Sequence, residues 1–73
     1  MSLSQKQLDV YADENLRVAA YQRAKAALAE NTAWEAAAGI THETREYQRL
    51  NQAVIDAEQQ LPKRFKKAAR KGL

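Results

Sequence analysis

The residues best suited to chemistry stand at the end of the chain, in "LPKRFKKAARKGL", which holds six basic residues and no acidic one. On a helix, the cations of this segment fall opposite its apolar residues. The cations are Lys63, Arg64, Lys66, Lys67, Arg70 and Lys71. Such a row of charge suits phosphates, because neutralising them releases condensed counterions. Four lysines and two arginines favour point-charge attraction over bidentate reading of bases, which predicts nucleic-acid binding without sequence preference.

Other interpretations fit the same segment. Phe65 could anchor it to the rest of the chain, while the Lys and Arg stems cover apolar surface and keep their charges in water. A basic amphipathic helix also suits an anionic membrane surface. Phe65 and Leu73 are its only large apolar groups besides Leu61, however, which makes a membrane partner the weakest alternative. With Phe65 as its one aromatic, the segment is also a poor stacking platform for single strands.

Side chains for catalysis or metal binding are scarce. The chain has no cysteine, so thiol chemistry and thiolate metal sites are excluded. His42 is the only histidine, and the neighbouring Glu43 and Glu46 fit better as acids at the positive end of a helix than as metal ligands. We therefore expect no enzyme, no cofactor and no metal.

The charge distribution divides the chain into two parts. Residues 1–61, which we take as the body, hold nine acidic and six basic residues and carry a net charge of −3. Residues 62–73 carry +6. This arrangement suits nucleic acid, but it equally suits an acidic protein surface, including that of a second copy.

The composition predicts an all-α fold, a helical hairpin with a short connecting helix and a short basic C-terminal helix. Ser4 and Gln7 have the spacing of a capping box, and no strong helix breaker follows before Gly39. We expect the first helix to end near residue 30, a short helix Ala33–Ala38 to follow, and Thr41 to cap the second long helix. That helix carries apolar residues at alternating steps of three and four, the spacing of a coiled-coil seam. They are Tyr47, Leu50, Val54, Ala57 and Leu61. Pro62 ends the helix and opens the last one, Lys63–Leu73.

A chain of 73 residues buries little surface alone, so we expect copies to pair, most simply as a dimeric four-helix bundle. The first helix has two apolar stripes on nearly opposite sides, which indicates contacts on two sides. One stripe is Leu8, Ala12, Ala19 and Ala26, flanked by Leu16, Tyr11 and Val18, and the other is Val10, Tyr21 and Leu28. Trp34 fits either a plug at the open end of the hairpin or an anchor for a partner. Our predicted contacts with a copy or partner are Val10, Tyr21, Leu28, Trp34 and Ile55.

The order of these parts resembles that of small phage head-completion proteins, in which a β-hairpin separates the helices. "NTAWEAAAGI" matches such a hairpin poorly, and no residue roles carry over. The resemblance implies the alternative function, a structural or assembly protein whose basic segment docks on an acidic protein surface. The sequence shows neither an apolar run of signal-peptide type nor one of roughly 20 residues, so we expect a cytoplasmic location.

Overall fold

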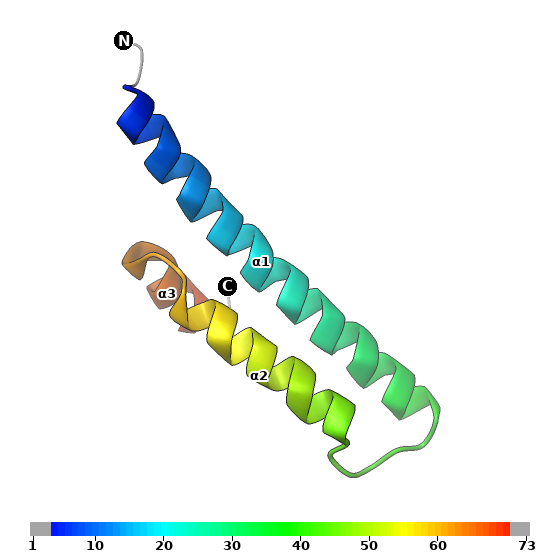
Figure 1. The fold of residues 1–73 in the computed structure, drawn as a ribbon. Helices are drawn as coiled ribbons and strands as arrows, with labels where there is room; N and C mark the ends of the chain where they lie inside the picture. Colours follow the sequence, from blue (N-terminus) through cyan, green and yellow to red (C-terminus); the bar gives the residue numbers. More distant parts are fainter. Residues whose placement is uncertain (1–3, 71–73) are drawn as a thin grey trace.

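The computed structural model describes residues 4–70, which form three helices and no strand (Figure 1). They are α1 (Gln5–Ala37), α2 (Arg45–Gln59) and α3 (Lys63–Arg70). The all-α prediction is confirmed. None of the described helices is both long and apolar enough to cross a membrane.

Helix α1 forms the long axis of the molecule. Its 33 residues span about 50 Å at 1.5 Å per residue, and the longest dimension of the molecule is 55 Å. The predicted capping box is present at its start. The Gln7 N–H donates to Ser4 Oγ at 3.2 Å, and the Ser4 N–H donates to Gln7 Oε1 at 3.0 Å.

The predicted separate helix Ala33–Ala38 is wrong, because α1 continues unbroken through this segment to Ala37. The Thr32 hydroxyl donates to the Leu28 carbonyl at 2.9 Å, so this side chain bonds within the helix instead of starting a new one. The stop at Gly39 is confirmed. Gly39 has φ +76°, and the N–H groups of Gly39 and Ile40 donate to the carbonyls of Ala36 and Glu35, which closes a Schellman motif.

Helix α2 begins three residues later than predicted, because Thr44 and not Thr41 is its cap. The Tyr47 N–H donates to Thr44 Oγ1 at 3.0 Å. The Thr44 hydroxyl in turn donates to the Glu35 carboxylate, at 2.7 Å from Oε1, which ties the start of α2 to the end of α1. From there α2 folds back antiparallel beside the second half of α1 (Figure 1). At about 22 Å it covers less than half the length of α1.

The interior between the helices is thin. The predicted apolar stripe is half-buried along α2. Its last member, Leu61, lies just past the end of α2 and is 4% exposed, which makes it the one described residue that is buried. On α1, four of the half-buried residues lie seven positions apart along one line. We call this line the inner stripe, and its members are Glu14, Tyr21, Leu28 and Glu35.

The chain turns at Pro62, whose carbonyl accepts the N–H groups of Phe65 and Lys66. Helix α3 starts at Lys63 as predicted and lies beside the end of α2 (Figure 1). It is described as far as Arg70, so residues 71–73 of the predicted helix lie outside the described part.

Candidate anionic-partner site on the basic helix

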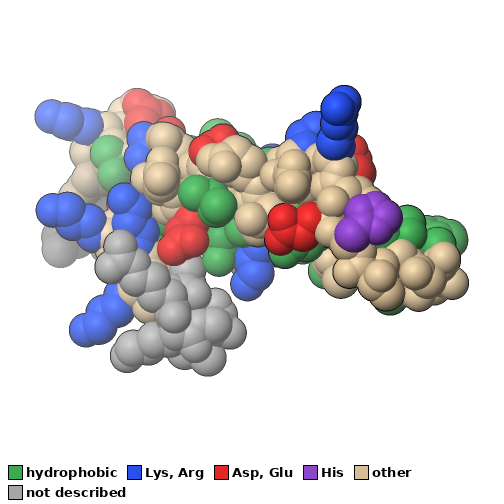
Figure 2. All heavy atoms as spheres, turned by 90° about the horizontal axis from the view of Figure 1, so that it is seen from below, with side chains coloured by type: hydrophobic (Ala, Val, Ile, Leu, Met, Phe, Trp, Pro, Cys, Tyr) green, Lys and Arg blue, Asp and Glu red, His purple; other side chains and the backbone are tan. Residues whose placement is uncertain are grey.

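Helix α3 carries five of the six predicted cations on a folded element. Lys63, Arg64 and Lys67 are exposed, and Lys66 is half-buried. The side chain of Arg70 and the whole of Lys71 lie outside the described part of the chain. On the face drawn in Figure 2, several Lys and Arg side chains lie toward the end opposite the histidine, with acidic side chains between.

One of these cations is held by the body. The Arg64 guanidinium forms an ion pair with Glu14 of α1, although the two residues stand 50 positions apart in the sequence. The same guanidinium lies over the ring of Phe65, with Arg64 Cζ 4.9 Å from the ring centroid. Phe65 is half-buried, in line with the anchoring interpretation. These contacts fix α3 and leave Lys63 and Lys67 exposed, four residues apart and on one side of the helix.

A second contact from α1 meets the end of α2. Arg17 forms an ion pair with Asp13 at 2.8 Å, and its Nη1 lies 3.5 Å from the carbonyl oxygen of Gln60. A cation suits this position, because the carbonyl end of a helix carries partial negative charge. Neither Glu14 nor Arg17 was predicted from the sequence as part of a site. The sequence did offer one indication for Glu14, because it lies seven residues before Tyr21 on the inner stripe.

The predicted partner contacts fall into two groups. Val10, Trp34 and Ile55 are exposed, Trp34 at 73%. The interpretation of Trp34 as a plug is therefore wrong. Tyr21 and Leu28 are half-buried within the single chain, between Glu14 and Glu35, which contact α3 and the cap of α2. As contacts between copies, all five residues remain a prediction.

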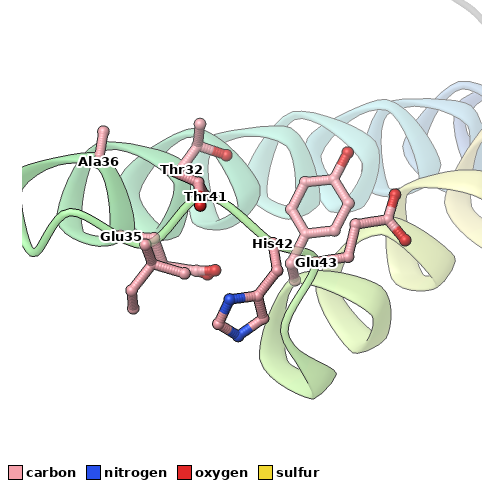
Figure 3. Close-up of a pocket in the computed structure, with 8 residues that line it drawn as sticks. Thr32, Glu35, Ala36, Thr41, His42 and Glu43 are labelled. Atoms are coloured by element: carbon pink, nitrogen blue, oxygen red, sulfur yellow. The ribbon is translucent and has the colours of Figure 1, made fainter.

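The turn between α1 and α2 borders a hollow of about 250 Å³ that is open to solvent (Figure 3). Its walls come from the end of α1, the loop and the start of α2, with Glu35, His42 and Tyr47 among the lining residues. Glu35 has a structural role, because its carboxylate accepts hydrogen bonds from the Thr44 hydroxyl and, at 3.1 Å, from Asn31 Nδ2. Among the described residues, no three His, Asp or Glu side chains form a group that could hold a metal ion.

In one exposed ion pair on α2, each side chain shifts the pKa of the other. Arg49 donates hydrogen bonds to the Glu46 carboxylate, from Nε at 3.1 Å, and this lowers the pKa of Glu46. The same hydrogen bonds raise the pKa of Arg49. The pair lies near the start of α2, away from the basic helix.

Comparisons of the chain with protein-family models, with curated proteins and with solved structures found no match.

Proposed function

We propose that this chain is a small non-enzymatic binding module that associates with itself and presents α3 to the phosphates of nucleic acid, without sequence preference. The observation that carries the proposal is the way α3 is held. Leu61, Phe65 and the Arg64–Glu14 ion pair fix the helix on the body, while Lys63 and Lys67 stay exposed. A helix already folded and held loses less conformational freedom on binding than a free basic tail.

Self-association is supported by the thin interior. A helical hairpin of α1 and α2 with only Leu61 buried among the described residues lacks the core that small domains need. Large apolar side chains, including Leu16 at 67% exposure and Trp34, are left on its surface. Pairing into a dimeric helical bundle would cover such side chains.

A second function is favoured by one specific contact. Arg64 of the basic helix already pairs with an acidic residue of the body, Glu14. The same chemistry on a neighbouring molecule would make the chain an assembly protein, whose basic helix docks on an acidic protein surface. In that case nucleic acid plays no part.

The deciding experiment is fluorescence anisotropy of a labelled DNA duplex titrated with the full chain at several salt concentrations. Replacing the two exposed lysines together, Lys63→Gln with Lys67→Gln, should weaken binding and flatten the log–log salt dependence by about 1.8, at about 0.9 per phosphate contact. The matched control is Lys6→Gln with Arg45→Gln, which removes the same charge from exposed positions elsewhere. It should leave most of the salt slope in place.

Failure of the full chain to bind the duplex even at low salt would overturn the nucleic-acid function. Equal losses in the two double variants would also count against it, because attraction would then follow net charge and not α3. Light scattering on the same proteins tests the second function. A lower mass for the α3 variant alone would support docking of the basic helix on a protein surface.

A further inference from the structure

One side of α1 has no partner within the described chain. The inner stripe faces α2 and α3, as the contacts of Glu35 and Glu14 show. On the opposite side, steps of three and four residues trace a line that we call the outer face. Its members are Leu8, Ala12, Leu16, Ala19, Arg23, Ala26, Glu30, Trp34 and Ala37. Leu8, Leu16 and Trp34 are the large apolar side chains on it, and all three are exposed.

The chain as a whole exposes more surface than a compact chain of its mass, and the difference is large enough for a stable interface. Compact single chains of 8.2 kDa expose about 4,500 Å², whereas this chain exposes 5985 Å². The excess, about 1,500 Å², is larger than the roughly 800 Å² that each partner contributes to a standard interface. The elongated shape, 55 × 19 × 17 Å, places this excess along the helices.

We infer that the outer face of α1 pairs with the same face of a second copy, antiparallel and centred on Ala26. The inference rests on the self-association in the proposed function and names its surface. The charges of the outer face favour a second copy as the partner, because Arg23 and Glu30 are its only charged members and have opposite signs. Around a twofold axis beside Ala26, Arg23 meets the partner's Glu30, and symmetry makes the contact twice.

The same two charges disfavour three related arrangements of like copies. A parallel pair in register sets Arg23 against the partner's Arg23. An antiparallel pair shifted by one heptad opposes either the two arginines or the two glutamates. Like charges held close across an interface are costly, so among these arrangements the charges favour the antiparallel register at Ala26.

Side-chain sizes agree with that register. Trp34 lies across from the partner's Ala19, and Leu16 lies across from the partner's Ala37. At these two levels a large side chain therefore meets a small one, which lets the surfaces interdigitate. At the centre, Ala26 faces its own copy and permits close approach of the two helix axes. Tryptophan set in such a position is typical of residues that dominate binding energy.

The first test uses the absence of cysteine from the sequence. Full-length chains carrying Ala26→Cys should form a disulfide-linked dimer on mild oxidation, because the two sulfurs meet at the axis. The matched control, Leu8→Cys, lies on the same face but far from the axis in an antiparallel pair. It should stay uncrosslinked. A parallel pair would crosslink at both positions.

The second test is a charge exchange followed by sedimentation. Arg23→Glu and Glu30→Arg should each weaken the dimer by about tenfold, since each creates two like-charged contacts, and the double variant should recover most of the loss. Trp34→Ala should weaken it by about 100-fold or more, because each dimer loses two anchors. Circular dichroism should show that every variant keeps its helix content, since these side chains face away from α2.

The outcomes distinguish self-association itself from the face assigned to it. A full chain that remains a monomer at all concentrations overturns the self-association in the proposed function, and this inference with it. A dimer in which Ala26→Cys stays uncrosslinked and the charge exchange has no effect overturns the assigned face alone. Duplex binding is measured separately and decides neither question.

Discussion

The two ends of the α1–α2 pair are held together by different means. At the turn end, Gly39 reverses the chain, Thr44 caps α2, and the Glu35 carboxylate receives the Thr44 hydroxyl nine residues along the sequence. At the other end, α2 meets α3, and we call this the junction end. Here Leu61 is buried, and Arg64 reaches Glu14 across 50 positions. One end is closed by local hydrogen bonds, and the other by burial and long-range charge.

This difference bears on function, because the junction end sets the position of the basic helix. A change at the turn end alters how readily the helices pair, yet leaves the cations of α3 where they are relative to α2. A change at the junction end moves those cations or releases them. Substitutions at the two ends therefore separate stability from presentation of charge, and the following variants are ordered by expected effect.

The largest effect is expected at the junction end from Leu61→Ala. Removing the one buried side chain among the described residues should lower the free energy of unfolding by about 2–4 kcal/mol, since transfer and cavity costs add. Urea denaturation followed by circular dichroism measures the change. The matched control is Ile55→Ala, at a position 39% exposed, which should cost less than about 1 kcal/mol. Equal losses would mean that burial does not distinguish the junction.

The next effect is expected at the turn end from Thr44→Ala. Loss of the capping oxygen leaves the Tyr47 N–H unpaired and should cost about 1 kcal/mol of unfolding free energy. Thr41→Ala is the matched control and should change stability by no more than a few tenths of a kcal/mol, within the range for exposed sites. Thermal unfolding of the two variants side by side gives the comparison. A larger loss of stability from Thr41→Ala would show that Thr41 caps α2, as the sequence predicts, and that Thr44 does not.

These two threonines show what sequence can and cannot settle. Both have the side chain of a cap, and only the contact between Thr44 and Glu35 of the preceding helix decides between them. Features within one turn of helix were predictable, as the Ser4–Gln7 box and the stop at Gly39 show. The continuity of α1 past Asn31 was not predictable, because the polar residue Thr32 fits equally well as the cap of a new helix.

The candidate site divides in the same way. The cations of α3 and its start after Pro62 follow from composition and the properties of proline. That Glu14 receives Arg64 could not be predicted, since it depends on where α2 ends against α1. Likewise, two apolar stripes were visible on α1, but only the fold assigns Tyr21 and Leu28 to the side that meets α2.

A smaller effect is expected from Arg64→Gln, which removes the ion pair at the junction end. Because the Arg64 side chain is 62% exposed, the loss in unfolding free energy should be only about 0.5 kcal/mol, and less at high salt. Amide hydrogen exchange should nevertheless speed up in α3 more than in α2. Glu14→Gln should reproduce the result, and the double variant should add little to either change. Additive losses would show that the two side chains act independently.

The smallest effect is a pH dependence at the turn end, from Glu46 and Arg49. The hydrogen bonds from Arg49 lower the pKa of Glu46 in the folded chain, so folding favours the ionised carboxylate. The resulting stability is present in full above the unfolded pKa, near 4.5, and is lost as the pH falls through the lower folded value. Carboxyl NMR titration should show the pKa of Glu46 rising toward its ordinary value in Arg49→Gln. An unchanged pKa would contradict the pair. Because both side chains are exposed, the shift should shrink with added salt, whereas the loss from Leu61→Ala at the other end should persist.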